Sequence, residues 1–282
     1  MLKWAICSMA LFAAVISFAQ TTSTPNYRGT PKPTIRDYGP FTNSEVVKTN
    51  AVTSWAKGMC GNPAGHCLFY GGDFYYNPIS ATVANGLANE TTNLVSASPY
   101  GAATWVPFTV PEGETWAVTG LFTNDMSNYG VLDQAPLLPA SVAYWAVMEG
   151  VEPGTPGTIV ASGTSPATST PTGRAAFSLI EYTIQVTGLS FDLTSGSYWM
   201  IVVPVCTNTA DPYCSEVFFE SDVDYINATP TNAYGPPEPL DASFFDSSLF
   251  AASFDPTNGP LGACGGSGCD AFSAGVLGKS TK

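Results

Sequence analysis

The segments Ala103–Phe122, ATWVPFTVPEGETWAVTGLF, and Glu181–Val205, EYTIQVTGLSFDLTSGSYWMIVVPV, decide the fold class. Apolar and polar residues alternate through much of both, which is the period of two of a β-strand with one buried face. Pro and Gly interrupt both segments at short intervals, as they do at turns. The sequence therefore predicts an all-β protein, an antiparallel and jelly-roll-like β-sandwich with its core strands within residues 103–205.

Two runs near the end of this region differ in their pattern. In Ile180–Val186 the apolar side chains are expected to face the core, and Glu181 and Thr183 to face solvent. Tyr198–Val205 is apolar at nearly every position, which predicts a central strand that is covered on both faces.

Turn chemistry and aromatic residues add two further predictions. Pro111, Glu112 and Gly113 are typical of a turn, so Trp105–Val110 is expected to pair with Thr115–Phe122 as a hairpin. Four tryptophans that lie in predicted strands are expected in the core: Trp105, Trp116, Trp145 and Trp199.

The chain divides into four predicted parts. Residues 1–19 have the basic, apolar and small-residue pattern of a secretory signal peptide, so a secreted or cell-surface location is expected. Residues 20–57 are predicted to form an extended arm that lies on the acidic body or adds a strand to a neighbouring copy. Residues 58–278 are predicted to form one β-domain and 279–282 a tail, with no membrane span.

The charge balance argues against whole classes of partner. The net charge is −13, and Arg174 is the one basic residue between Lys57 and Lys279. Such a surface repels phosphate backbones and anionic lipids, so nucleic acid is not an expected partner. Arg174 itself is either a solvated loop charge or an anchor for a carboxylate.

Six cysteines follow the predicted signal peptide, and an even number in an exported chain indicates disulfides. We expect three local bridges that staple loops, although fifteen connectivities are open. The alternative for the first pair is a metal site that also uses His66. The expected pairs are Cys60 with Cys67, Cys206 with Cys214, and Cys264 with Cys269.

Catalytic motifs are scarce. His66 is the single histidine, and no nucleophile elbow or zinc-protease motif is present. The Gly278-Lys279-Ser280 ending imitates a phosphate loop, but Ser273 stands where the first glycine belongs. No catalytic residue and no certain cofactor are predicted, although a pair of carboxylates for glycoside hydrolysis stays open.

Two clusters are candidates for ligand binding. Glu220, Asp222 and Asp224 occupy alternate positions, so one strand face would carry three carboxylates, an arrangement that suits Ca²⁺. The alternative is a solvated strand edge that resists aggregation. Asp73, Tyr75 and Tyr76 combine an acid with aromatic rings that can stack on a sugar, or else pack a loop beneath the sandwich.

The motifs FTVPEGETWAVTG from Phe108, YWAV from Tyr144, GTPGTIVASG from Gly154 and GSYWMIV from Gly196 resemble those of exported bacterial β-sandwich proteins of the PEP-CTERM and choice-of-anchor type. The resemblance covers roughly Ala102–Val205 and extends loosely to FSAGVLG from Phe272. It implies export and a β-sandwich, and it carries over no catalytic residue. Pro237-Glu238-Pro239 matches the sorting tripeptide, but neither a membrane span nor a basic tail follows, which favours a released protein.

Together these patterns lead to three functional hypotheses. The first is a non-catalytic secreted or surface protein with a structural, matrix or adhesive role, whose partners are polysaccharides or other surface proteins. The second is a carbohydrate-binding module, with Ca²⁺ dependence left open. The third is a glycoside-active enzyme.

Overall fold

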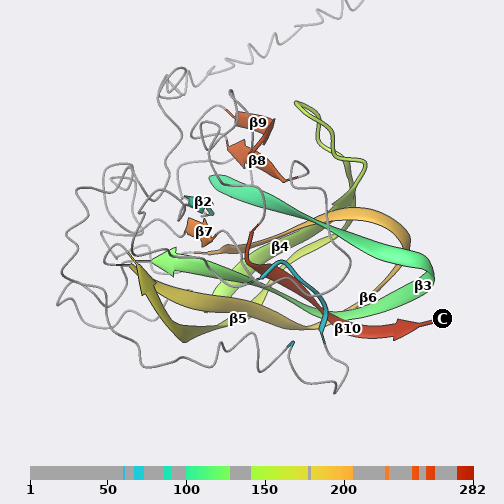
Figure 1. Cartoon of the computed structure of the whole chain (residues 1–282), viewed down its shortest axis with the longest axis horizontal. Coiled ribbons are helices and arrows are strands. Elements are labelled where there is room, and N and C mark those ends of the chain that lie inside the picture. Colours follow the sequence, from blue (N-terminus) through green and yellow to red (C-terminus); the bar gives the residue numbers. More distant parts are fainter. Residues whose placement is uncertain are drawn as a thin grey trace, which may run out of the picture.

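A computed structural model describes residues 60, 67–72, 86–89, 100–127, 141–176, 179–205, 226–228, 243–247, 252–257 and 272–282. Every strand pair in these ranges is antiparallel, which confirms the prediction of an antiparallel all-β fold (Figure 1). The strands are β1 (Cys67–Tyr70), β2 (Gly86–Ala88), β3 (Ala102–Ser127), β4 (Val142–Glu149), β5 (Thr158–Ala176), β6 (Leu179–Pro204), β7 (Ile226–Ala228), β8 (Phe244–Ser247), β9 (Ala252–Pro256) and β10 (Ala274–Thr281).

The centre of the fold is a ribbon made of β3 and β6, each 26 residues long. The two strands pair from Val106 opposite Met200 to Ser127 opposite Ile180. The predicted hairpin within β3 is therefore wrong, because both of its proposed arms pair with β6 and not with each other. The turn residues 111–114 stand opposite Ser195 alone, and this excess of residues on one strand bends the whole ribbon.

The bend folds the ribbon back on itself, and Figure 1 shows β3 and β6 curving at the same side of the molecule. The rings of Phe108 and Trp116 stack at 6.0 Å, whereas eight residues of straight strand would separate them by about 27 Å. The two halves of the ribbon therefore enclose a shared core. Its buried members include Val106, Phe108, Val110, Trp116, Val118, Leu121, Ile184, Val186 and Val276.

The last part of β6 is buried on both faces, as its continuous apolar sequence predicts. Met200 and Val202 belong to the shared core, while Ile201 and Val203 belong to a second cluster on the opposite face. Trp105, together with residues of β8 and β9, covers that second cluster. Of the four tryptophans, Trp105, Trp116 and Trp145 are buried and Trp199 packs against the second cluster, which confirms their placement in the core.

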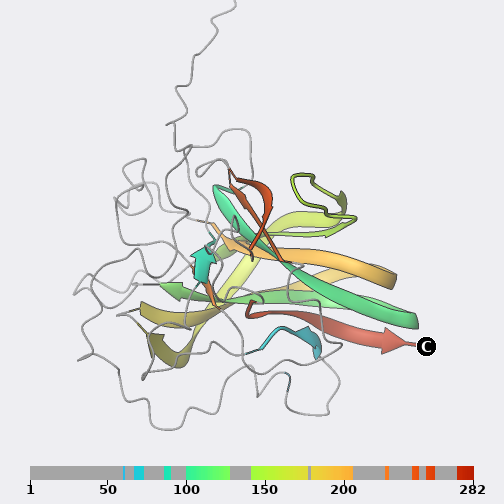
Figure 2. The same cartoon turned by 45° about the horizontal axis from the view of Figure 1, so that its top comes forward.

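The strands also close a ring, because β6 pairs with β4, β4 with β5, and β5 again with β6. The contact of β5 with β6 ends at Val186, and Gly188 follows with a φ of 75°. Beyond Gly188, β6 continues beside β3 and leaves the first half of β5 without a second neighbour among the described strands. Figure 2 presents the ring from a second direction.

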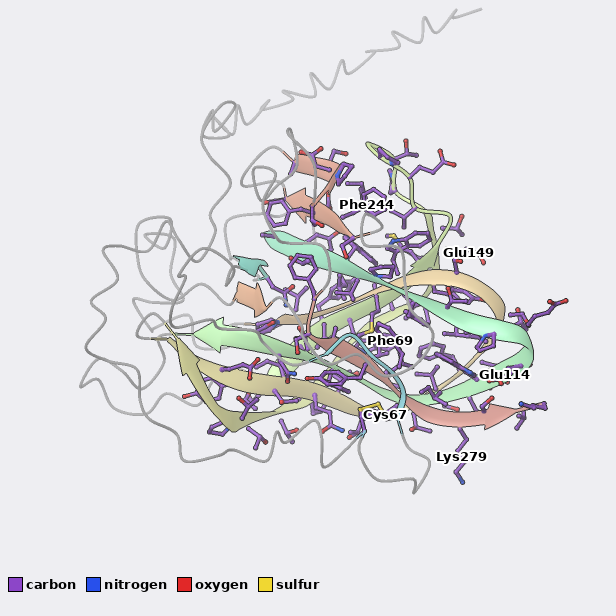
Figure 3. The ribbon with its side chains drawn as sticks, viewed as in Figure 1. Cys67, Phe69, Glu114, Glu149, Phe244 and Lys279 are labelled. Carbon is purple, nitrogen blue, oxygen red and sulfur yellow. A yellow bond between two sulfur atoms is a disulfide. The ribbon has the colours of Figure 1, made fainter. Side chains whose placement is uncertain are left out.

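The segment from Phe272 closes the sheet as expected, since β10 lies between β1 and β3. The predicted tail at residues 279–282 is wrong for its first three residues. Lys279, Ser280 and Thr281 pair with β3, and the Ser280 hydroxyl donates to the Glu114 carboxylate at 2.7 Å. Figure 3 labels Lys279 on β10 and Glu114 on β3. The sequence that imitates a phosphate loop is thus part of a strand.

A disulfide joins Cys60 to Cys67 at the beginning of β1, with Cα atoms 5.0 Å apart. The first of the three predicted local bridges is therefore present, and a metal site on these two thiolates is wrong. Cys206, Cys214, Cys264 and Cys269 lie outside the described residues, so their pairing stays a prediction.

The corner of the ribbon provides a test of the turn chemistry. Gly113 has a φ of 77°, and a Cβ at this position would meet nothing within 4 Å. We expect Gly113→Ala to lower the free energy of unfolding by about 1 kcal/mol, because only the left-handed backbone opposes the new side chain. Gly113→Asn, which tolerates this conformation better, should lose clearly less in urea unfolding. Equal losses for the two variants would contradict this account.

Candidate functional site

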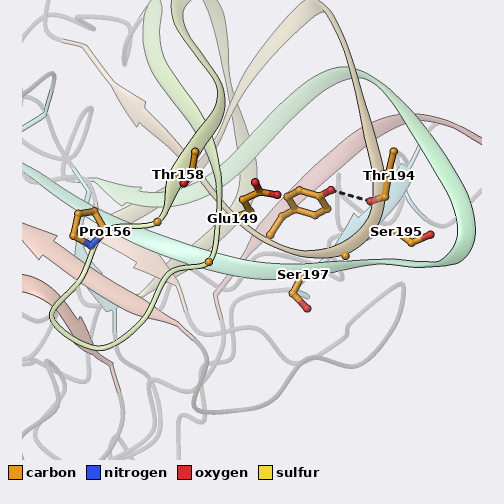
Figure 4. A pocket seen from close by; sticks show the side chains of 10 residues that line it. Glu149, Pro156, Thr158, Thr194, Ser195 and Ser197 are labelled. Atoms are coloured by element: carbon orange, nitrogen blue, oxygen red, sulfur yellow. Dashed lines mark hydrogen bonds between the residues drawn. The ribbon is translucent and has the colours of Figure 1, made fainter.

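A surface hollow of about 560 Å³ lies between the connection from β4 to β5 and the corner of β6. Figure 4 shows its two walls, one carrying Glu149 and Thr158 and the other Thr194, Ser195 and Ser197. The full lining is Glu149, Gly150, Pro156, Gly157, Thr158, Thr194, Ser195, Gly196, Ser197 and Tyr198. It therefore combines one carboxylate, several hydroxyls and the accessible backbone of three glycines.

The inner wall of the hollow is held in place by hydrogen bonds. The Tyr198 hydroxyl donates to the carbonyl oxygen of Thr194 at 2.9 Å, and the tyrosine is only 5% exposed. The Ser195 hydroxyl accepts from the backbone N–H of Gly113 at 2.9 Å and donates to the carbonyl oxygen of Glu114 at 3.3 Å. The ribbon corner thus fixes one side of the hollow, and such preorganisation lowers the entropic cost of binding a ligand.

Apolar residues adjoin the hollow on β5. Ile159 and Val160 are 51% and 40% exposed, and they are the exposed large hydrophobic residues in the described part of the chain. They follow Thr158 directly, and the rest of the first half of β5 is made of small and hydroxyl-bearing residues without charge. Glu149 and Glu152, both exposed, are the charged residues of the adjacent connection.

The site residues predicted from the sequence fall elsewhere. Asp73, Tyr75 and Tyr76 lie outside the described residues, as do the three acids Glu220, Asp222 and Asp224. The predicted sugar-binding cluster and the predicted Ca²⁺ site therefore stay predictions. Within the described ranges, no three His, Cys, Asp or Glu residues are grouped so that they could hold a metal ion.

The sequence analysis missed a buried carboxyl group at the far end of the ribbon. Asp125 is 0% exposed and points to the shared core. Its carboxylate accepts from Asn89 Nδ2 at 3.0 Å and from the Thr123 hydroxyl at 2.9 Å. Burial, with a smaller contribution from the nearby charge of Glu181, raises the pKa of Asp125 to about 8 despite these two donors.

The opposite face of the same ribbon end is also polar and buried. Asn124 accepts from the Thr183 hydroxyl at 2.5 Å and donates to Ser273 Oγ at 2.7 Å. The Ser273 hydroxyl in turn donates to the carbonyl oxygen of Gly72 at 2.5 Å. The chain of bonds ties β3, β6 and the start of β10 together.

Glu181 and Thr183 correct the prediction for the strand that begins at Ile180. Both were expected to face solvent, but they are 0% and 1% exposed. The alternation itself is right, since Tyr182, Ile184 and Val186 lie in the core. The polar face is buried as well, and Glu181 accepts from the Thr172 hydroxyl of β5 at 2.5 Å. A period of two reveals two faces but not what covers them.

No protein-family model matches the chain, and no curated protein matches it either. The resemblance to exported proteins of the PEP-CTERM type thus stays a prediction from the motifs quoted above. Among the described residues there is no helix of the length and apolarity that a membrane crossing requires.

Asp125 should make stability depend on pH. Because its folded pKa of about 8 exceeds the value near 3.9 of an unfolded aspartate, the folded state keeps a proton that the unfolded state loses between these pH values. The free energy of unfolding should therefore fall as pH rises from about 4 to 8, by at most about 1.4 kcal/mol per pH unit from this group.

Asp125→Asn should remove the part of the pH dependence that comes from Asp125, and the exposed Asp192→Asn serves as the control for the loss of a surface charge. Urea unfolding between pH 5 and 8 measures the effect. Burial also raises the pKa of Asp246, so a smaller slope of the same sign should persist in the variant. An Asp125→Asn protein with the full parental slope would refute the assignment.

Proposed function

We propose that the protein is a non-catalytic exported β-protein with an adhesive or matrix role, and that the hollow beside Glu149 contacts its ligand. The supporting observation is the composition of that hollow. A single carboxylate among hydroxyls and glycine backbone offers hydrogen bonds to a polar ligand, whereas acid–base cleavage of a glycoside commonly needs two carboxyl groups.

The second candidate, carbohydrate recognition, specifies the ligand of the same hollow. A sugar presents many hydroxyls, which pair with Ser and Thr side chains, with backbone groups and with a carboxylate. The net charge of −13 and Glu149 itself disfavour acidic polymers, so the proposed ligand is a neutral polysaccharide. Ile159 and Val160, next to the hollow, offer apolar surface to the flat faces of sugar rings.

The test is a binding assay on mature protein with neutral soluble polysaccharides such as dextran, laminarin and xyloglucan. We expect Glu149→Gln to weaken binding about tenfold, because a charge-assisted hydrogen bond is lost. Glu152→Gln is the matched control, since Glu152 belongs to the same connection but does not line the hollow. If both variants bind the polysaccharide with the same affinity as the parent, the ligand-binding site lies outside the hollow.

Two parallel measurements separate the remaining hypotheses. Release of reducing ends from any polymer of the panel, lost in Glu149→Gln, would replace the adhesive role with a glycoside-active one. Loss of binding in EDTA would point to Ca²⁺ and to the acids at residues 220–224. Binding that is insensitive to EDTA would leave the hollow as a metal-independent site.

A further inference from the structure

We propose that the first half of β5 accepts a strand from the N-terminal arm of a second copy, so that copies join head to tail. The acceptor is the edge Thr158–Pro166, and the donor is the segment Glu45–Trp55 of the next molecule. The inference deepens the proposed matrix role and rests on it, because it gives the physical link between copies.

The acceptor edge is open because of the course of β6. This strand pairs with β5 at residues 167–176 and turns away at Gly188, so no described strand lies beside residues 158–166 on that side. The backbone N–H of Ala167 donates to the carbonyl oxygen of Ser141, the residue before β4, at 2.8 Å, so the backbone groups of Ala167 face β4. Since neighbouring residues of a strand point in opposite directions, the backbone groups of Ser162 and Thr164 point to the open side.

Apart from a bulge at Val160, this edge lacks the features by which proteins protect exposed strands. Residues 158–166 contain no charge, and Pro166 alone at the far end interrupts the row of N–H groups. Ile159 and Val160 are exposed at the other end, ready to be covered by the side chains of an added strand. An unprotected edge of this kind favours a specific partner strand.

The donor is identified by composition and charge. Residues 41–57 contain neither Pro nor Gly, and EVVKTNAVTSW within them is rich in Val and Thr, which favour strands. Residues 20–57 hold five basic and two acidic residues, against three basic and twenty acidic in residues 58–282. Lys48 of the donor therefore suits an acceptor flanked by Glu149 and Glu152.

Connectivity favours a second copy over the chain's own arm. The arm enters the body at Cys60, which the disulfide fixes to the start of β1. β1 and β5 stand at opposite ends of the strand order, and the acceptor half of β5 pairs with β4 alone. Along the sheet the two are therefore five positions apart, through β10, β3, β6 and β4, or about 24 Å. The five residues from Trp55 to Cys60 span at most about 17 Å even when extended.

Donor and acceptor are thus two different surfaces of one molecule. Contacts of this type propagate into rings or filaments unless two copies exchange their arms reciprocally and close a dimer. Copies that join through β1-side arms and β5 edges would form a chain, which is the assembly that a matrix protein needs.

The experiment uses the mature full chain and two variants in size-exclusion chromatography with light scattering. Thr49→Pro interrupts the donor segment and keeps the acceptor intact. Thr164→Pro removes an outward N–H of the acceptor and keeps the arm intact. Thr22→Pro, in the arm but outside the donor segment, is the control.

We expect the parent and the control to form species at successive multiples of the monomer mass as concentration rises. Each interrupted variant alone should stay monomeric, and an equal mixture of the two should stop at twice the monomer mass, since only one donor and one acceptor remain functional. Circular dichroism of Thr164→Pro checks that it is folded, and Thr49→Pro tests the donor without touching the body.

Two results would overturn the inference. One is a parent chain that stays monomeric at every concentration, and the other is a Thr49→Pro chain that associates like the parent. A dimer that persists in Thr49→Pro but not in Thr164→Pro would assign the edge to pairing between two β5 strands. Because Glu149, Ile159 and Val160 belong to both proposals, polysaccharide binding is also measured on Thr49→Pro, whose hollow is intact and whose donor segment is interrupted. Sugar binding by this variant without association, or association of the parent without sugar binding, separates the failure of the assembly from the failure of the proposed ligand.

Discussion

The bend of the β3–β6 ribbon is the constraint on which the rest of the structure depends. Four residues of β3 face the single Ser195 of β6, whose hydroxyl bonds to Gly113 and Glu114 across the corner. Because the ribbon returns over itself, Phe108 meets Trp116 and the core closes. The same corner forms one wall of the hollow, so the element that creates the core also positions the candidate site.

The interior of the ribbon changes character along its length. Near the corner it is aromatic and aliphatic, and at the far end it holds Asp125, while Asn124 and Glu181 are buried on the opposite face of the ribbon; all three have hydrogen-bond partners. A buried hydrogen bond of this kind adds little net free energy to the folded state. A buried donor or acceptor that lacks its partner, however, destabilises the fold by its full desolvation cost. The polar end therefore specifies which strands meet, while the apolar end supplies most of the driving force.

Local chemistry predicted much of this fold. Periodicity predicted the strand from Ile180 and the apolar run to Val203, and the resemblance extended to the segment from Phe272 that contains Val276. The hairpin prediction failed because Pro111–Gly113 specify a reversal of direction but not the partner strand, which lies some eighty residues away. The hollow could not be predicted from the sequence for a related reason. Its lining residues come from β4, β5, β6 and the connection between β4 and β5, so no single segment of the sequence contains them together.

The position of β10 has a consequence for how the chain reaches its folded state. This strand lies between β1 and β3, and its Ala274 and Val276 are almost fully buried. The apolar interior is incomplete until residues 274–281 have left the ribosome, so earlier portions lack a stable arrangement during synthesis. Long-range pairing of this kind is slow. The core therefore forms only once strands from distant parts of the sequence have paired.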